Sequence, residues 1–170
     1  EADFIGVVDL LTMEAMVWET DDLGADPTIV EIPEDVRPAA DRARSIILER
    51  IVETDDELME RYLEGEEITA AELRAALRKG TIAGTLTPVF CCTALRNKGV
   101  QPVLDAVVHY LPSPLDIPDV SGTDPKTGDG VTRAPSDDDP LSALVFKIVT
   151  DPYVGKLAYF RVYSGVLRAG

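Results

Sequence analysis

Runs of apolar and β-branched residues near both ends of the chain predict β-strands. Toward the N-terminus, residues 4–18 predict one or two strands, and residues 28–32 predict a further short strand after a loop at 19–27. Toward the C-terminus, residues 141–149 and 156–164 predict two strands that form a β-hairpin with a longer loop.

Between these strands, apolar residues recur every three or four positions, which is typical of amphipathic helices. The first helix is expected to open at Pro33, where the acidic residues that follow suit a helix N-terminus, and a second covers residues 55–63. The third is expected to begin at a capping box made by Thr69 and Glu72 and to end at Gly80, a C-cap glycine.

The most informative stretch follows that third helix. Residues 86–92 predict a buried strand, and a short polar turn then leads into a compact helix that starts near Gln101 and Pro102. A strand that feeds a turn and a helix can present backbone N–H groups to a ligand. The apolar face expected for this last helix comprises Val100, Val103, Leu104, Val107 and Val108.

Length and composition limit the number of domains that the chain can form. Its 170 residues, 45% of them hydrophobic, are enough to bury a core in one domain or in two partial ones. Residues 112–138 are rich in Pro, Gly, Asp, Ser and Thr, which predicts a linker between domains at 1–111 and 139–170. Because the chain begins and ends in strand-like sequence without an initial Met, we expect it to be a piece of a longer protein.

Two adjacent cysteines, Cys91 and Cys92, fall in the predicted strand at 86–92. Neighbouring strand side chains point to opposite faces, so the pair is poorly placed for a disulfide and is expected to be small core residues. With no signal peptide or long apolar span in the sequence, this favours a reducing cytoplasm. The single histidine, His109, is interpreted as structural and partly exposed, so neither a metal site nor a redox site is expected.

No combination of a nucleophile and a base is visible, and three short patterns lack the residues that their chemistry needs. Gly155-Lys156 is followed by Leu157 where a phosphate-binding loop has Ser or Thr. Asn97-Lys98 is followed two positions later by Val100 where guanine recognition needs a carboxylate. Three consecutive acids at 137–139 lie in the linker without ligand spacing, so a solvated run is expected.

Charge is distributed unevenly along the chain. The formal net charge is −15, which disfavours nucleic-acid binding by the surface as a whole. Residues 31–67 hold 13 acids and 5 basic residues, and the helical spacing places several acids on one face. This face is either a solvated surface or a docking site for a lysine-rich partner. The candidate partner-binding residues are Asp41, Glu49, Glu53, Glu57 and Glu60.

The C-terminal hairpin has the opposite balance. Residues 141–170 contain one acid, Asp151, and four basic residues among several aromatic ones. Such a hairpin could face RNA phosphates, and an ordinary hairpin with exposed cations is an equal alternative.

Taken in order, these segments resemble elongation factor G, the ribosomal translocase. The resemblance rests on residues 4–10, 57–63, 96–102, 110–114 and 136–165, and it spans essentially the whole chain. It implies an α/β fold: the C-terminal part of a Rossmann-like P-loop G domain with an inserted α+β subdomain at about 10–85. The first strands of a β-barrel domain would follow from residue 139.

The resemblance also implies functional residues. In that family a turn that reads Ser-Ala-Phe or Ser-Ala-Leu uses a backbone N–H to reach the guanine carbonyl, and here it corresponds to Thr93, Ala94 and Leu95. The phosphate loop, both switch segments, the Mg²⁺ ligands and the Asn-Lys-x-Asp motif are absent from this sequence. The chain alone is therefore expected to be inactive, with no bound GTP or GDP, whereas the parent protein would be a translational GTPase that binds GTP, GDP and Mg²⁺.

The family's partners are the ribosome, namely the large-subunit stalk protein for the inserted subdomain and small-subunit RNA for the barrel domain. A cytoplasmic monomer without membrane association is implied. Two alternatives remain open: a paralogous ribosome-protection or release factor, and a free-standing acidic protein-interaction module with no nucleotide role.

Overall fold

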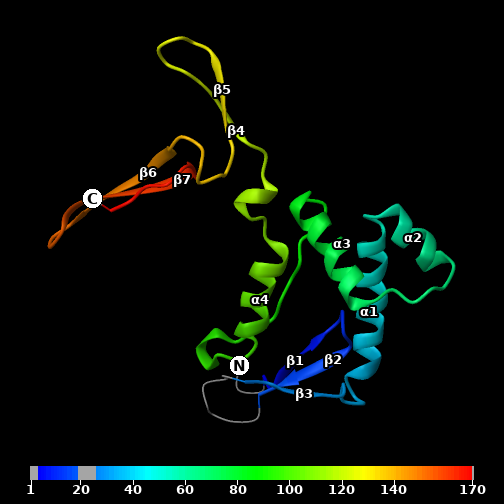
Figure 1. The fold of residues 1–170 in the computed structure, drawn as a ribbon. Helices are drawn as coiled ribbons and strands as arrows, with labels where there is room; N and C mark the ends of the chain where they lie inside the picture. Colours follow the sequence, from blue (N-terminus) through cyan, green and yellow to red (C-terminus); the bar gives the residue numbers. More distant parts are fainter. Residues whose placement is uncertain (1–3, 19–25, 170) are drawn as a thin grey trace. The chain divides into compact units, whose positions relative to one another are not determined.

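The structure, a computed structural model, describes residues 4–18 and 26–169 (Figure 1). The described residues form a mixed α/β fold with four α-helices and three small antiparallel sheets. They divide into two compact units, Glu1–Leu111 and Pro112–Gly170. None of the helices in this described part has the length and the apolar run that crossing a membrane requires.

The first unit begins with an antiparallel sheet of β1 (Gly6–Asp9), β2 (Glu14–Val17) and β3 (Thr28–Val30). Residues 4–18 thus form two strands, because Asp9 stops the first one. Its Oδ1 accepts the backbone N–H of Leu11 at 2.7 Å, and Met13 adopts a left-handed φ of 58° that reverses the chain. The predicted loop at 19–27 lies mostly outside the described residues.

Four helices follow: α1 (Arg37–Val52), α2 (Asp56–Leu63), α3 (Ala70–Ile82) and α4 (Val100–Tyr110). The first begins later than expected. The N–H groups of Val36 and Arg37 both donate to the Pro33 carbonyl in a preceding turn, at 3.0 and 2.9 Å, and Pro38 then occupies the first turn of the helix, where its missing N–H costs nothing.

The predicted capping box at the start of α3 is confirmed. The Thr69 hydroxyl accepts the Glu72 N–H, and the Glu72 carboxylate accepts the Thr69 N–H at 2.8 Å. Arg61 on α2 donates to the same carboxylate at 2.7 Å. The hydrogen bond from Arg61, followed by those from Thr69, lowers the pKa of Glu72 to about 2. This carboxylate therefore stays ionised and joins α2 to the start of α3.

The predicted end of α3 was wrong, because the helix continues through Gly80 to Ile82. A Cβ at position 80 would lie 2.8 Å from Cδ1 of Leu86, so this glycine makes room for the returning chain. The left-handed residue after the helix is Gly84, at φ +73°. Its N–H donates to Thr81 and that of Thr85 to Gly80, at 3.1 and 2.9 Å, which is a Schellman ending.

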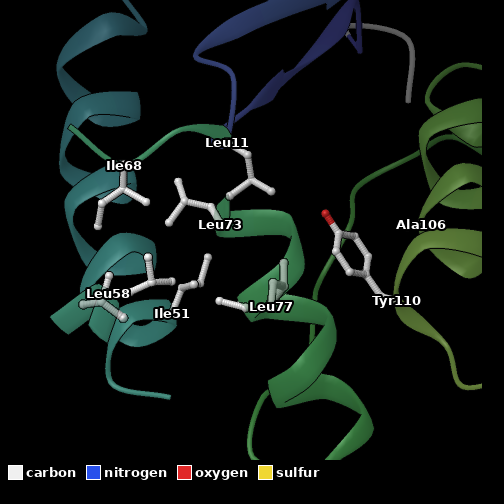
Figure 2. Close-up of a cluster of buried hydrophobic side chains, with 10 residues drawn as sticks. Leu11, Ile51, Leu58, Ile68, Leu73, Leu77, Ala106 and Tyr110 are labelled. Atoms are coloured by element: carbon white, nitrogen blue, oxygen red, sulfur yellow. The ribbon is translucent and has the colours of Figure 1, made fainter. Parts of the chain in front are cut away.

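The main core of the first unit is a cluster between α1, α2, α3 and α4 (Figure 2). Leu73 on α3 is fully buried, and Ile51 and Val52 at the end of α1 are almost completely buried with it. Tyr110 brings α4 into the cluster, and burial raises the pKa of its phenol. The third helix is therefore the central element of this unit, since it packs on both α1 and α4.

Three expectations downstream of α3 were wrong. Residues 86–92 form no strand, and both cysteines are exposed rather than buried. In α4, Ala106 and Tyr110 are buried, whereas the expected core residues Leu104, Val107 and Val108 are exposed. A strand needs neighbouring strands for its hydrogen bonds and its burial. Within the described residues, no strand pairs with this segment.

The second unit contains two hairpins: β4 (Val120–Thr123) with β5 (Gly130–Arg133), and β6 (Ser142–Asp151) with β7 (Gly155–Ser164). The first hairpin lies inside the segment that was predicted to be a linker at 112–138. The same segment holds a short 3-10 helix, η2 (Pro114–Asp116).

The loop between β6 and β7 has three residues, 152–154, rather than the longer span expected. Asp151 shortens it, because its Oδ1 accepts the N–H groups of Tyr153 and Val154 at 2.8 and 2.9 Å. Gly155 then closes the turn at φ +85°, as three-residue hairpin loops require.

Candidate functional site

The predicted guanine-contacting residues lie together in a closed turn that leads into α4. The Thr93 N–H donates to the Lys98 carbonyl at 2.9 Å, and the Lys98 N–H donates back to Thr93 at 3.2 Å. This bridge encloses a 3-10 helix, η1 (Ala94–Arg96). Asn97, at φ 53°, and Gly99, at φ 78°, then reverse the chain into α4.

The turn is attached to the sheet of the first unit. Lys98 Nζ donates to the carbonyl oxygen of Trp18, just after β2, at 3.0 Å. Trp18 is 2% exposed, so the lysine is held by a buried part of the fold. Sequence reasoning missed this contact because 80 residues separate the partners. The bond gives Lys98 a structural role. The sequence pattern Asn97-Lys98-Gly99-Val100, which partly resembles a guanine-recognition motif, did not indicate this role.

Thr93 and Leu95 differ sharply in exposure. Thr93 is 5% exposed, and its hydroxyl has no hydrogen-bond partner within the described part of the chain. Leu95 is 82% exposed, and Ala94 is exposed as well. The N–H groups of Ala94 and Leu95 precede the first hydrogen bond of the 3-10 helix, so that helix does not use them.

The five candidate partner-binding acids are all exposed, but they lie on two helices. Asp41 and Glu49 are on α1, Glu53 caps its end, and Glu57 and Glu60 are on α2. The stripe is broken because Asp55 caps α2 and starts a new helix direction.

Arginines on α1 neutralise part of this acidic surface. Arg37 pairs with Asp41 at 2.9 Å, and Arg50 pairs with Glu53 at 3.1 Å. The cations in these pairs are themselves exposed, so each pair contributes little to stability. The two helices therefore keep an acidic surface with locally fixed ion pairs.

The register of β6 and β7 separates the hairpin into two faces. Lys147 lies opposite Tyr159, and Arg161 follows two positions after that tyrosine, so both cations share one face. Lys147 Nζ is 6.0 Å from the centre of the Tyr159 ring, and Arg161 Cζ is 5.6 Å from that of Tyr163. Lys156 pairs with Thr150 on the opposite face and is not part of this basic, aromatic surface.

The middle of the opposite face is apolar. Phe160 pairs with Val145, and Ala158 pairs with Ile148. Of these residues, Phe160, Val145 and Ile148 expose 43%, 54% and 68% of their surface. The face with the cations is mixed, because Leu144, Val149 and Leu157 lie on it as well. Two strands rarely form a stable sheet on their own.

The remaining sequence patterns lie in the following places among the described residues. Gly155 and Lys156 begin β7 and are not part of a phosphate-binding loop. Within the described residues no group of three or more His, Cys, Asp or Glu side chains is placed to hold a metal. His109 is exposed on α4 beside Tyr110.

No protein-family model matches the chain. A crystal structure of a protein from Thermus thermophilus is similar to it over 95% of this chain, with 35% sequence identity and a TM-score of 0.70. This similarity supports the mixed α/β arrangement described above. The chain spans only 21% of the length of that protein.

Proposed function

We propose that this chain is a segment of a translational GTPase of the elongation factor G type. The parent protein would use GTP hydrolysis to move tRNA and mRNA on the ribosome. In this proposal, the first unit is the C-terminal part of a Rossmann-like G domain with its inserted subdomain, and β6 and β7 are the first strands of a β-barrel. The similarity to a much longer protein is consistent with a segment of this kind.

The observation that carries the proposal is the turn from Thr93 to Gly99. It carries two N–H groups that its own helix does not use, on the exposed residues Ala94 and Leu95. This is the position where the family reads the guanine carbonyl. The buried Thr93 hydroxyl beneath the turn has no partner within the described residues. A preceding part of the G domain would bring a polar partner to this hydroxyl.

The exposed apolar residues around the turn support the same interpretation. Val89 and Phe90 expose 84% and 44% of their surface, and Leu104 and Val108 on α4 expose 61% and 76%. Strands of parallel α/β sheets are buried on both faces and read as continuous apolar runs. Residues 86–92 would become such a strand, with α4 packed on the sheet, once the neighbouring strands of the parent protein are present.

This chain would contribute recognition and docking, not the chemical step. The parts that hold the phosphates and the Mg²⁺ in such GTPases would belong to other segments of the parent protein. Ala94 would donate its N–H to the guanine, and the acidic helices α1 and α2 would bind the large-subunit stalk protein. The face with Lys147 and Arg161 would meet small-subunit RNA, with its tyrosines supporting the cations.

The first test removes one N–H from the turn in the full-length parent protein. Ala94→Pro suits the local geometry, because the first helical position accepts proline and Thr93 before it is extended, at φ −114° and ψ 98°. We expect affinity for fluorescent GDP to fall about three- to tenfold, the contribution of one neutral hydrogen bond. Ala94→Ser, which keeps the N–H, is the matched control and should bind normally.

Two results would contradict this assignment. Equal GDP affinity of the Ala94→Pro and Ala94→Ser proteins would show that the turn does not contact the nucleotide. We expect no saturable binding of fluorescent GDP to the isolated 170-residue chain. Tight binding would show that the essential nucleotide-binding parts lie within this chain, contrary to the proposal.

A second prediction concerns the acidic helices. Reversing Glu49 and Glu53 to lysine should weaken binding of the isolated C-terminal domain of the stalk protein about tenfold at low salt, because exposed opposite charges attract and steer a partner. Titration calorimetry over a range of salt concentrations measures the effect, which should shrink as ions screen the charges. Reversing Asp137 and Asp138 gives the same change in net charge in the second unit and should leave the affinity unchanged.

A further inference from the structure

A small hollow of about 70 Å³ lies in the second unit, where the segments around η2 and β5 meet β7. Two arginines and an aromatic ring line it: Arg133 at the end of β5, and Arg161 and Tyr163 on β7. The rest of its wall is apolar and comprises Pro114, Ile117, Pro118, Val120, Pro135 and Val162. The hollow therefore brings together parts of the chain that are distant in the sequence.

The size of the hollow limits what can occupy it. Pockets that bury a cofactor or another small molecule measure about 300–1,000 Å³. A volume of about 70 Å³ holds about two water molecules, each of which takes about 30 Å³ in the liquid, or one group of similar size. The occupant is therefore a single chemical group, either a free ion or one group of a larger ligand.

The two cations at the hollow have no carboxylate to balance them. Arg161 Cζ lies 5.6 Å from the centre of the Tyr163 ring, and Arg133 Nη1 donates to the neighbouring carbonyl of Thr132 at 3.0 Å. Within the described residues, no aspartate or glutamate lines the hollow, and neither arginine forms an ion pair. The charge of the hollow thus suits an anion.

Backbone contacts hold the two arginines in a fixed relation. The segment after β5 is attached to β7, because the Gly165 N–H donates to the Ser136 carbonyl at 2.9 Å and the Ser164 hydroxyl donates to the Pro140 carbonyl at 2.7 Å. Ser164 is 2% exposed, so this attachment is buried. The site is therefore formed before a ligand arrives, which lowers the entropy cost of binding.

The surroundings of the hollow favour a phosphate that belongs to a nucleic acid. Low-dielectric walls around charges of one sign concentrate anions, and a planar guanidinium matches the oxygens of a phosphate. Arg161 also lies on the face of β6 and β7 that carries Lys147 and the ring of Tyr159. Cations that track phosphates beside aromatic rings that stack on bases are typical of surfaces that bind single-stranded RNA.

From these observations we infer that the hollow binds one backbone phosphate of RNA, with Arg133 and Arg161 donating hydrogen bonds to its oxygens. The inference rests on the proposed contact between this hairpin and small-subunit RNA, and it adds Arg133, which lies outside the hairpin. A phosphate contact positions the RNA without reading its sequence. The site therefore sets where β6 and β7 lie on the RNA.

The test removes the charge of Arg133 in the 170-residue chain and leaves the hairpin itself unchanged. Arg133→Gln removes the charge and keeps a polar side chain, whereas Arg133→Lys keeps the charge without the planar fork. Lys126→Gln is the matched control, because it removes the same charge from an exposed residue between β4 and β5 that does not line the hollow. The probe is small-subunit ribosomal RNA freed of protein, and filter binding measures its affinity over a range of salt concentrations.

We expect Arg133→Gln to weaken RNA binding about five- to tenfold. The slope of log affinity against log salt should become shallower by about 0.7–0.9, which corresponds to the loss of one phosphate contact. Arg133→Lys should keep the slope and lose part of the affinity, because a point charge replaces a bidentate donor. Lys126→Gln should bind like the original chain.

Three results would overturn the inference. If Arg133→Gln binds RNA as Lys126→Gln does while Lys147→Gln weakens binding, the hollow is not a phosphate site and the RNA contact of the hairpin stands. If the original chain does not bind the RNA at low salt, the proposed RNA contact fails, and the phosphate site fails with it. If inorganic phosphate alone shifts the NMR signals of the Arg133 side chain while Arg133→Gln keeps its RNA affinity, the hollow binds a free anion instead of RNA.

Discussion

Replacing Leu73 with alanine is expected to lower the free energy of unfolding of the first unit by about 2–5 kcal/mol, the range measured for fully buried leucines. Leu73 is completely inaccessible and lies at the centre of the cluster in Figure 2. The change removes apolar contacts and leaves a cavity, because α3 is held on both sides by α1 and α4 and cannot move to fill it. This would be a large share of the stability of a small domain.

The single tryptophan makes the measurement specific to this unit. Trp18 is buried in the first unit, so denaturant unfolding followed by its fluorescence does not report the hairpins of the second unit. Leu63→Ala is the matched control, since the same atoms are removed from a side chain that is 77% exposed. We expect it to change stability by about 0.5 kcal/mol or less. Equal losses for both variants would mean that α3 is not the centre of the core.

Local sequence rules predicted the elements whose stabilising contacts are close in the chain. The capping box of Thr69 and Glu72 is an interaction over three residues, and it forms as expected. The end of α3 was missed because the role of Gly80 depends on Leu86 packing against it, and helix-end rules place glycine at a C-cap by default. The short loop between β6 and β7 was missed for a different reason. Its cause is local, because Asp151 accepts the N–H groups of Tyr153 and Val154, and such an aspartate turn is a signal that the sequence itself carries.

Burial was harder to predict than secondary structure. An apolar run such as residues 86–92 is buried only where other strands or helices cover it, and in this chain Val89 remains 84% exposed. The same reasoning placed Cys91 and Cys92 in a core, whereas both are exposed. An apolar pattern shows which side chains of a segment are suited to burial. It does not show which other segments cover them, because those segments can be distant in the sequence.

The candidate sites also differ in whether their residues are close together or far apart in the sequence. Thr93, Ala94 and Leu95 are consecutive, so their gathering in one turn follows from sequence order. The bond from Lys98 to Trp18 and the small hollow of the second unit join distant segments, and no local pattern indicates either. The register of β6 and β7 likewise decided that Arg161 shares a face with Lys147 while Lys156 does not.

Gly99→Ala is expected to disrupt the turn that holds Thr93, Ala94 and Leu95. At φ +78° an alanine costs about 1–2 kcal/mol of backbone strain. Its Cβ would also lie 2.9 Å from the carbonyl oxygen of Cys91, a backbone atom that cannot move without shifting the turn. Because strain and collision act together, the bridge between Thr93 and Lys98 should open.

Two observables follow this opening in the 170-residue chain. Hydrogen exchange at the Thr93 and Lys98 amides, which now bond each other's carbonyls, should accelerate by about tenfold or more, since about 1.4 kcal/mol of lost local stability is a factor of ten. Trp18 fluorescence should shift to the red as the attachment of Lys98 loosens and water reaches the ring. Unchanged exchange at both amides would mean that the bridge does not depend on the glycine.

Gly84→Ala separates the two causes. Position 84 has nearly the same left-handed conformation, φ +73°, but nothing lies within 4 Å of the added Cβ. Gly84→Ala should therefore lower stability through backbone strain alone, without a steric collision. The hydrogen exchange of the Thr93 and Lys98 amides should not change. Loss of GDP affinity in the Gly99→Ala variant of the proposed parent protein, with normal affinity in Gly84→Ala, would support the proposed role of this turn in nucleotide binding.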